Sequence, residues 1–295
     1  MDHVRRGDVF SESVPGLRRI SLSGMIKMPG IRPFKKASEF IARSFGNRQH
    51  DIALVLGSGL GGFTKHLTDK EILSTTEIPD YPRSTVPGHS GEIVSASVGK
   101  KRALVFGGRV HYYESASTVN AAVTAIVAGE LGIPKIVLTN AAGILNEAFR
   151  PGDLMLIQDQ LNLTFRNVLS DMRFPVANIR PLYSEELAQL ALAAAVKSGV
   201  NLQSGTYVGL TGPSYETAAE VRFYRILGGD AIGMSTVHEA MYARAVGIDV
   251  AGISCLTNYS TGITSTKLSH DEVTEIGAMV DEKFSRLLSK FIDLL

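Results

Sequence analysis

The sequence lacks several features on which whole classes of protein depend. It has one cysteine, Cys255, so it forms neither an intramolecular disulfide nor a cysteine-based zinc cluster, which favours a reducing compartment. Tryptophan is absent and aromatic residues make up only 7% of the chain, which disfavours a base-stacking platform for single-stranded nucleic acid. The 30 Lys and Arg residues balance 29 Asp and Glu residues, so the overall charge attracts neither nucleic acid nor an anionic membrane. Any anion is therefore expected to bind at a local site.

A long apolar run is also missing. The most apolar stretch, residues 121–145, contains Glu130 and Lys135 and is not expected to span a membrane. The first 16 residues carry three acids and no apolar run, so a secretory signal is not expected. We therefore expect a cytoplasmic protein with no membrane or nucleic-acid partner.

The organisation of the chain predicts one large domain behind a short extension. Residues 1–34 have no sustained period and contain three prolines, which indicates an extension that is only partly ordered. Apolar residues then recur at helical spacing from Phe34 to Phe45. With 44% hydrophobic residues, the chain of 295 residues has enough apolar side chains for a large core. Residues 35–295 are expected to form a single domain.

Short apolar runs alternate with helical patterns along this domain. Continuously apolar strands are typical of a sheet that is buried on both faces. Helix ends are marked by Ser184 and Gly199, and S/T-x-x-E capping boxes begin at Thr217 and Ser269. We predict an α/β fold with a mixed, mostly parallel central sheet flanked by helices. The predicted strands are Ile52–Leu56, Ile93–Val98, Arg102–Phe106, Lys135–Thr139, Leu154–Gln158, Thr206–Leu210, Ala231–Met234 and Val250–Ser254.

Chemically distinctive residues come directly after these predicted strands. In folds of this kind ligands bind outside the carboxyl ends of the strands, so we expect these residues to meet at one edge of the sheet. The segments that follow the strands are 57–62, 107–114, 140–143, 211–216, 235–236 and 255–258.

The glycine-rich loop after the first strand has three interpretations. Gly57, Gly59 and Gly62 match the G-x-G-x-x-G pattern of dinucleotide-binding folds. That fold also needs a second strand ending in an acid about 20 residues later, and the stretch up to Asp80 contains no buried strand. The loop is equally typical of a tight turn, or of an anion-binding nest to which Ser58 adds a hydroxyl.

Two other pairs of residues indicate an anion site and a site for a flat heterocycle. Arg109 and His111 are two apart, so on an extended segment both point to the same side, where they can bind phosphate oxygens. His89 lies in a turn-rich loop, where simple exposure to solvent is the alternative. Glu216 and Asn258, if they face each other across a pocket, place acceptors and a donor at opposite ends of a planar ring.

The motifs around these residues resemble those of a known family. The motifs GSGLGG, PGHSGE, GGRVHYYE, TNAAGILN, GPSYETAAEVR, GGDAIGMSTVHE, LTN and SHDEV occur in order and closely resemble the trimeric, low-molecular-mass purine nucleoside phosphorylases. The resemblance extends from about residue 34 to residue 295. It implies reversible phosphorolysis of 6-oxopurine nucleosides such as inosine and guanosine, which gives the free base and (deoxy)ribose 1-phosphate. It also implies a homotrimer, no metal or organic cofactor, and inorganic phosphate as co-substrate.

The resemblance implies a role for each matching residue. The phosphate site comprises Ser58, His89, Arg109, His111, Ala141 and Ser235. The ribose contacts are Tyr113, Met234 and His270, and the base contacts are Glu216 and Asn258, with Ala142, Gly143, Tyr215 and Ile232 lining the base pocket. Asn258, Glu216, His270 and His111 are the expected catalytic residues, and Phe165 is the aromatic side chain expected to cover the sugar of a neighbouring subunit.

Three alternative functions are consistent with parts of the sequence. A phosphorylase of the same fold that acts on methylthioadenosine is expected to carry an acid where this chain has Asn258. An NAD(P)-dependent oxidoreductase is supported by the glycine loop alone. A non-catalytic nucleoside-binding protein explains the pocket, but it does not need a full set of phosphate ligands.

Overall fold

The computed structural model describes residues 32–86, 88–175, 178–264 and 270–295, and in the last of these ranges it describes side chains from residue 275 onward. The strands are β1 (Ile52–Val55), β2 (Thr68–Ser74), β3 (Glu92–Val98), β4 (Lys101–Phe106), β5 (Lys135–Ile144), β6 (Leu154–Asn162), β7 (Leu202–Gly209), β8 (Ala231–Gly233) and β9 (Asp249–Tyr259). The helices are α1 (Lys35–Ser44), α2 (Tyr112–Ser115), α3 (Thr118–Ala121), α4 (Val123–Glu130), α5 (Val168–Asp171), α6 (Glu185–Ser198), α7 (Ala218–Ile226), α8 (Val237–Ala245) and α9 (His270–Asp293), with 3-10 turns η1 (Gly61–His66) and η2 (Thr75–Glu77).

The strands form one mixed sheet, ordered β2-β3-β4-β1-β5-β8-β7-β6-β9. Strand β9 also pairs with β5, so the second half of the sheet closes on itself. The pairs β1–β4, β1–β5, β5–β9, β6–β7 and β7–β8 are parallel, and β2–β3, β3–β4, β5–β8 and β6–β9 are antiparallel. The predicted α/β fold with a mixed sheet is confirmed.

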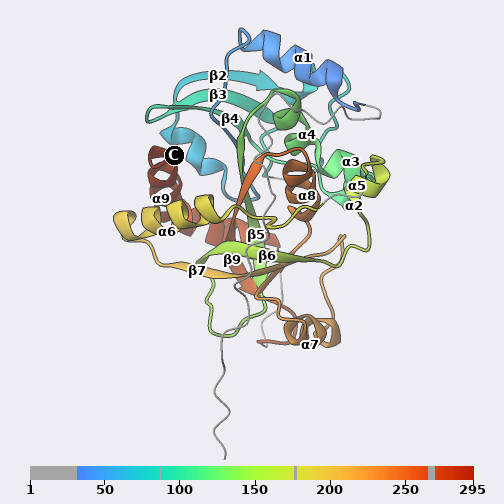
Figure 1. The fold of residues 1–295 in the computed structure, drawn as a ribbon. Helices are drawn as coiled ribbons and strands as arrows, with labels where there is room; N and C mark the ends of the chain where they lie inside the picture. Colours follow the sequence, from blue (N-terminus) through green and yellow to red (C-terminus); the bar gives the residue numbers. More distant parts are fainter. Residues whose placement is uncertain (1–31, 87, 176–177, 265–269) are drawn as a thin grey trace, which may run out of the picture.

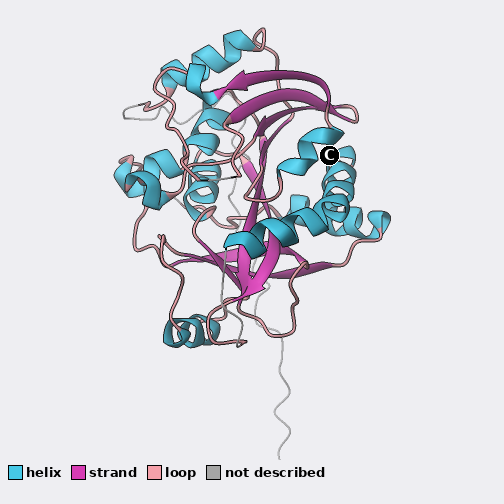
Figure 2. Ribbon diagram, turned by 180° about the vertical axis from the view of Figure 1, so that it is seen from behind, coloured by secondary structure: helices cyan, strands magenta, loops and turns pink. Residues whose placement is uncertain are grey.

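Helices cover both faces of this sheet, which explains why its strands are continuously apolar. All four residues of β1 are buried. Ile52 and Leu54 pack in the hydrophobic cluster that includes residues of α6 and α9, whereas Ala53 and Val55 pack in the cluster that includes residues of α1, α4 and α8. Successive side chains of a strand point to opposite faces, so a strand that is covered on both faces, such as β1, needs an apolar residue at every position. Figure 1 shows α6 and α9 on one side of the sheet and α4 and α8 on the other, and Figure 2 shows the same layers from behind.

The predicted helix ends are confirmed where the structure describes them. The Ser184 hydroxyl accepts a hydrogen bond from the N–H of Leu187 at 3.3 Å, and Gly199 ends α6 with a φ of +64°. Thr217 and Glu220 form the expected capping box at the start of α7. The capping box expected at Ser269 lies outside the described residues.

Four predictions about strand ends are wrong. Strand β6 continues past Gln158 to Asn162, and β7 begins at Leu202 and not at Thr206, because the two strands pair with each other along these extra residues. Strand β5 continues past Thr139 to Ile144, and β9 continues past Ser254 to Tyr259, because their second halves pair with each other and β5 also pairs with β8. Residues 140–143 and Asn258 therefore belong to strands and not to the loops that follow them. A shift of register between Ala142 and Gly143 lets the longer β9 strand continue beside β5.

One strand was not predicted at all. Strand β2 lies at the edge of the sheet and pairs antiparallel with β3. Its residues are mostly exposed and polar, so it lacks the apolar pattern that marks the other strands.

The glycine loop after β1 packs against the last helix of the fold. A Cβ atom placed on Gly277 of α9 would lie 2.9 Å from the Cα and the carbonyl oxygen of Gly59. The two backbones therefore touch, and no larger residue fits at position 277 without a shift of one segment. The loop leads into the short 3-10 helix η1 and not into an α-helix, so it lacks the context of a dinucleotide fingerprint.

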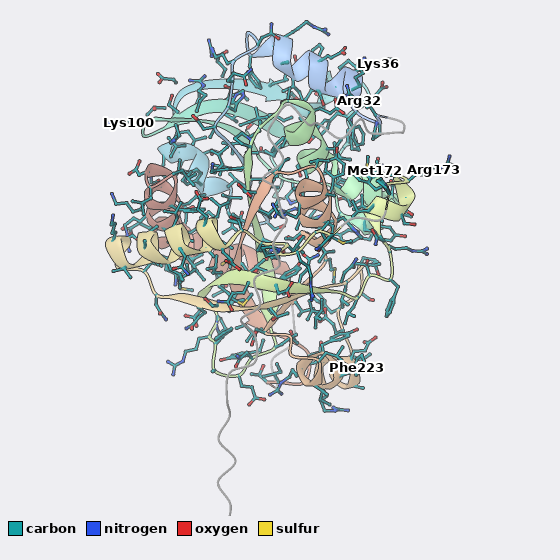
Figure 3. The ribbon with its side chains drawn as sticks, viewed as in Figure 1. Arg32, Lys36, Lys100, Met172, Arg173 and Phe223 are labelled. Carbon is teal, nitrogen blue, oxygen red and sulfur yellow. The ribbon has the colours of Figure 1, made fainter. Side chains whose placement is uncertain are left out.

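Helices α1 and α7 lie at opposite ends of the molecule (Figure 1). Helix α1 begins at Lys35 beside the buried Phe34, while the expected extension up to residue 31 lies outside the described residues. Helix α7 stands at the opposite end of the molecule from α1, and Phe223 points outward from it (Figures 1 and 3). None of the helices in the described ranges is long and apolar enough to cross a membrane.

Candidate active site

A cavity of about 340 Å³ gathers most of the residues that the sequence singled out. Strands β5, β8 and β9 supply one part of its wall, and the segments that follow β1, β4, β7, β8 and β9 supply most of the rest, with Val86 from the loop before β3. Its lining includes Ser58, Arg109, His111, Tyr113, Ala141, Ala142, Gly143, Tyr215, Glu216, Ile232, Met234, Ser235 and Asn258. Val86, Asn140, Pro213, Gly233, Thr257 and Ser260 complete it.

His89 lies directly behind this lining and contacts Ser58. Its Nε2 atom lies 3.3 Å from the Ser58 hydroxyl, and its Nδ1 atom accepts a hydrogen bond from the N–H of Arg109 at 3.3 Å. Burial, followed by the nearby positive charges of His111 and Arg109, lowers the pKa of His89 to about 4. The imidazole is therefore neutral at pH 7, and with Nδ1 accepting, its proton resides on Nε2, toward Ser58.

His111 stands between two other rings. It stacks on His89 with ring centroids 5.3 Å apart and on Tyr113 with centroids 5.0 Å apart. Its Nδ1 atom lies 3.1 Å from Oε1 of Glu114, which also accepts a hydrogen bond from the backbone N–H of His111 at 2.6 Å. Burial opposes ionisation of Glu114, but hydrogen bonds from His111 and Thr85 outweigh it and lower the pKa of this carboxyl group. An ionised Glu114 thus fixes the His111 ring at the cavity wall.

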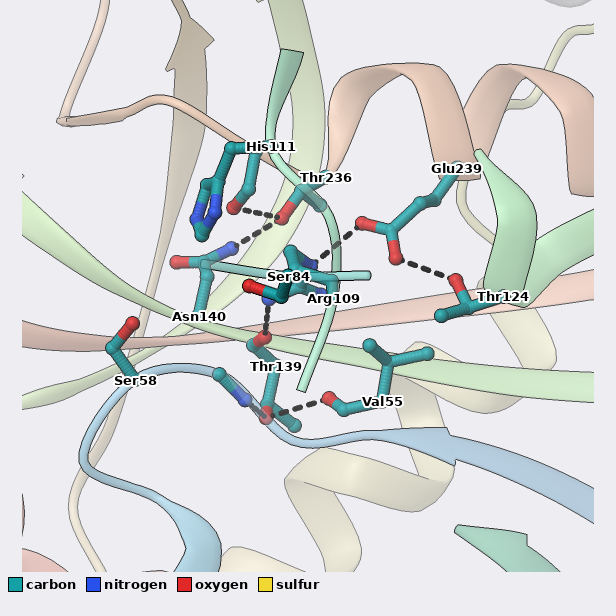
Figure 4. A network of polar contacts seen from close by, with 12 residues as sticks. Val55, Ser58, Ser84, Arg109, His111, Thr124, Thr139, Asn140, Thr236 and Glu239 are labelled. Atoms are coloured by element: carbon teal, nitrogen blue, oxygen red, sulfur yellow. Dashed lines mark hydrogen bonds and ion pairs between the residues drawn. The ribbon is translucent and has the colours of Figure 1, made fainter. Parts of the chain in front are cut away.

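Arg109 brings a buried positive charge to the cavity. Its Nε atom donates to Oε2 of Glu239 at 2.9 Å, and Nη1 donates to the carbonyl oxygen of Thr139 at 2.6 Å (Figure 4). Nη2 is buried and has no partner among the described residues. Glu239 in turn accepts a hydrogen bond from Thr124 at 2.6 Å. Because the cavity lining includes Arg109, the unused donor is a natural ligand for an anion there.

Ser235, in the cavity wall, is followed by Thr236, whose backbone conformation is strained. Thr236 has a φ of +73°, which is rare for a β-branched residue. Its hydroxyl accepts a hydrogen bond from Nδ2 of Asn140 at 2.9 Å and lies 3.1 Å from the Ser235 hydroxyl (Figure 4). Strain of this kind persists only where the surroundings enforce it, and it is common at functional sites.

Glu216 and Asn258 line the same cavity. Burial raises the pKa of Glu216, and the charge of Glu220 adds to this effect, whereas a backbone N–H lowers it. Oδ1 of Asn258 accepts a hydrogen bond from the Thr257 hydroxyl at 2.8 Å, and this bond orients the amide. The structure therefore brings together the carboxyl group and the amide that the sequence singled out, in the wall of one cavity.

Besides His89, two predicted residues are not placed in the cavity lining. The side chain of His270 lies outside the described residues, although the backbone of His270 begins α9. Phe165 is 89% exposed and has a φ of +53°. The loop around it is held by hydrogen bonds from Nδ2 of Asn162 to the Arg166 carbonyl at 2.8 Å and from the Thr164 hydroxyl to Oδ1 of Asn162 at 2.6 Å. The Phe165 ring is thus exposed on a loop that is ordered by its own hydrogen bonds.

Sequence reasoning missed the residues that support this site from behind. Glu239 and Glu114 hold Arg109 and His111, and Asn140 holds Thr236. The proximity of Glu114 to His111 in the sequence was the one available signal. The groups Arg109 and Glu239 are 130 residues apart, so no local pattern marks the pair. Within the described ranges, no cluster of three His, Cys, Asp or Glu residues is arranged to hold a metal ion.

Comparison with known proteins points to one family. Residues 51–293 match the family described as the phosphorylase superfamily. The chain is 39% identical over 265 residues to purine nucleoside phosphorylase 1 of Geobacillus stearothermophilus, an alignment that covers 88% of this chain and 96% of the relative. It is 40% identical over 259 residues to purine nucleoside phosphorylase of Mycobacterium tuberculosis, covering 88% of this chain and 94% of the relative. The solved structure of Schistosoma purine nucleoside phosphorylase in complex with hypoxanthine matches with a TM-score of 0.81 and 31% identity, covering 90% of this chain and 97% of that one.

Proposed function

The chain belongs to the phosphorylase superfamily and, within it, to the purine nucleoside phosphorylases, and we propose that it catalyses the reversible phosphorolysis of 6-oxopurine nucleosides. The products are the free purine base and (deoxy)ribose 1-phosphate. Inosine and guanosine are the proposed substrates, in purine salvage, and inorganic phosphate is the co-substrate, with no metal or organic cofactor.

One observation carries this proposal: a single cavity joins a buried cationic site to a carboxyl and amide site. Arg109, with its unused Nη2 donor, and Ser58 lie in the lining together with Glu216 and Asn258. Phosphate binding is assigned to the side with Arg109, together with His89, His111, Ser235 and the N–H of Ala141. The nucleoside is assigned to the other side, with its base between Glu216 and Asn258.

The proposed mechanism follows from the charges that develop as the glycosidic bond breaks. The bond electrons leave with the purine, so the sugar becomes cationic and the base anionic. Phosphate, held by Arg109 and by hydroxyl and imidazole donors, stabilises the cationic sugar and then forms the new bond to its anomeric carbon. On this side the protein works by positioning a nucleophile that is also the counter-charge.

The leaving base is stabilised at two points of its ring. The Asn258 amide donates a hydrogen bond to N7 as negative charge develops on the base, and the released anionic base then takes a proton from water. Glu216 accepts a hydrogen bond from the N1–H group of a 6-oxopurine. The raised pKa of Glu216 keeps its proton affinity closer to that of the base, which strengthens this hydrogen bond. His270 is proposed to bind the ribose 5′-hydroxyl, and Tyr113 and Met234 to contact the sugar.

We further propose that the enzyme is a cytoplasmic homotrimer in which Phe165 covers the sugar of a neighbouring subunit. The exposure of this ring, on a loop that is ordered by its own hydrogen bonds, supports the assignment. The single, buried Cys255 suits a reducing compartment.

The decisive experiment is an assay of base release from inosine, guanosine, adenosine and methylthioadenosine, each with and without phosphate. We expect rapid, phosphate-dependent release from inosine and guanosine, with ribose 1-phosphate as the second product. Preferential cleavage of methylthioadenosine would assign the chain to the other activity, and binding of nucleosides without turnover would remove the catalytic function.

A further inference from the structure

Ser260 carries a buried hydroxyl that has no hydrogen-bond partner among the described residues. The residue is 2% exposed, and it contributes to the lining of the large cavity. A buried hydroxyl without a partner is unfavourable, by an amount comparable to a lost hydrogen bond, and is uncommon in folded proteins. At a cavity wall, such a group is available to a ligand.

The position of Ser260 in the cavity follows from its neighbours. A Cβ atom placed on Gly143 would lie 2.8 Å from Oγ of Ser260 and 3.7 Å from Nδ2 of Asn258, so both polar groups lie close to the same point of β5. Gly262, two residues after Ser260, packs closely against Ala218. A Cβ atom placed on Gly262 would lie 2.7 Å from the Cβ atom of Ala218.

Ala218 is the first residue of α7 and comes two positions after Glu216. The chain therefore runs from Asn258, through Ser260, toward the helix start that carries Glu216. Ser260 thus lines the cavity next to Asn258, on the side from which the chain continues toward Glu216.

The chemistry of purines then identifies the atom that Ser260 faces. On the ring, the edge that runs from N7 to N1 carries the substituent at C6. If Asn258 holds N7 and Glu216 holds N1, as the proposed function requires, a group between them lies opposite this substituent.

We propose that Oγ of Ser260 binds the C6 substituent of the purine and is a specificity-determining residue of this site. A hydroxyl both donates and accepts hydrogen bonds, so it can donate to a 6-oxo group and accept from a 6-amino group. Ser260 thus favours purines with a polar group at C6 over purines with hydrogen there. It does not distinguish oxo from amino, a choice that falls to Glu216 and Asn258.

Three nucleosides that differ only at C6 test this inference: inosine with oxygen, adenosine with an amino group and purine riboside with hydrogen. In Ser260→Ala, kcat/KM for inosine and for adenosine should each fall about tenfold relative to purine riboside, which is the usual effect of removing one hydrogen bond to a buried group. An equal fall for all three nucleosides, or no fall for any, would overturn the assignment.

Ser254 provides a matched control. It lies on β9, the strand that Ser260 directly follows, is fully buried, and also has a hydroxyl without a partner in the described ranges, but it does not line the cavity. Ser254→Ala should leave the ratios of kcat/KM among the three nucleosides unchanged. A change in those ratios equal to that in Ser260→Ala would show that the effect comes from the strand and not from contact with the base.

Calorimetric binding of hypoxanthine, adenine and unsubstituted purine separates this inference from the proposed function on which it rests. If the wild-type protein turns over inosine but Ser260→Ala binds the three bases in wild-type ratio, this inference fails and the proposed function stands. If no nucleoside is cleaved, yet Ser260→Ala selectively weakens hypoxanthine and adenine, the proposed function fails and this inference stands. Absence of binding by all three bases would overturn both.

Discussion

The guanidinium group of Arg109 and the carboxylate of Glu239 form an ion pair inside the protein, with Nε 2.9 Å from Oε2 and side chains only 2% and 1% exposed. Isolating either charge in such surroundings is costly, because neither water nor another group replaces the lost partner. The pair therefore connects the stability of the fold to the charge that is proposed to bind phosphate.

Glu239→Gln should destabilise the protein by about 3–5 kcal/mol, since it leaves the Arg109 charge buried without a counter-ion. Urea unfolding followed by circular dichroism measures the change. Glu282→Gln is the control, because it breaks the exposed Arg286–Glu282 pair, whose side chains are 51% and 84% exposed, and should cost less than about 1 kcal/mol. Equal losses in the two variants would contradict the role of Glu239.

Arg109→Ala should weaken the use of phosphate by about 2–4 kcal/mol in kcat/KM, as expected when a charged partner of a desolvated anion is removed. Steady-state kinetics with phosphate as the varied substrate measures this effect. The double variant R109A/E239A removes both charges and should regain stability without regaining phosphate use. An unchanged phosphate dependence in Arg109→Ala would remove Arg109 from the phosphate site.

Asn258→Asp should shift preference from inosine toward adenosine. An ionised carboxylate accepts a hydrogen bond from a 6-amino group but not from a 6-oxo group, and a protonated one still donates to N7. A mismatch of this kind costs about 1–3 kcal/mol per unpaired group. The ratio of kcat/KM for inosine over adenosine should fall in the variant, and a ratio that stays constant would mean that Asn258 does not bind the base.

Stability should fall as the pH is lowered from about 6.5 toward 4. Burial lowers the pKa of both His50 and His238 to about 4, from 6.5, with the charges of Arg102 and Arg48 adding to the shift of His50. The unfolded chain therefore binds more protons than the folded one throughout this window, so each pH unit lost costs about 1.4 kcal/mol per group at most. Urea unfolding between pH 4 and 7 measures the slope, and His238→Phe should flatten it. A slope that is the same in the variant would exclude His238 as a contributor.

Phe165→Ala should raise KM for the nucleoside about tenfold and leave KM for phosphate nearly unchanged, because the ring is proposed to cover the sugar. In Glu216→Ala, every pocket that carries the substitution should lack catalytic activity. If Phe165 acts on a neighbour, refolding the two variants together should restore part of the activity, since some pockets then combine an intact Glu216 with an intact Phe165. Activity no greater than the sum of the separate variants would place Phe165 outside the neighbouring site.

Local patterns were sufficient to predict most of the fold but only the front of the site. Apolar runs marked the strands, and the caps at Ser184 and Thr217 marked helix starts, because these signals depend on neighbouring residues. The polar edge strand β2 gave no such signal, since only a few of its residues contribute to the core. The extension of β5 beyond Thr139 depends on pairing with β8 and β9, which are distant in sequence.

The same distinction holds within the site. Arg109 and His111 could be predicted as neighbours at the cavity because they are two residues apart on a segment that follows a strand. Glu239 and Ser260 could not, because their significance comes from a partner or a cavity assembled by remote parts of the chain. The family resemblance supplied expected roles for the residues of the cavity lining, and the structure added the residues that hold them, such as Glu239 and Glu114.

The contact between Gly59 and Gly277 has a consequence for the order in which the protein becomes active. The loop that carries Ser58 follows the first strand of the sheet, yet the backbone it rests on belongs to α9, far later in the chain. During synthesis on the ribosome this loop cannot pack against α9 until nearly the whole domain has been made. In a nascent or truncated chain that lacks α9, the loop of the proposed anion site therefore has no backbone to pack against, and we expect full activity only once the whole domain has been made.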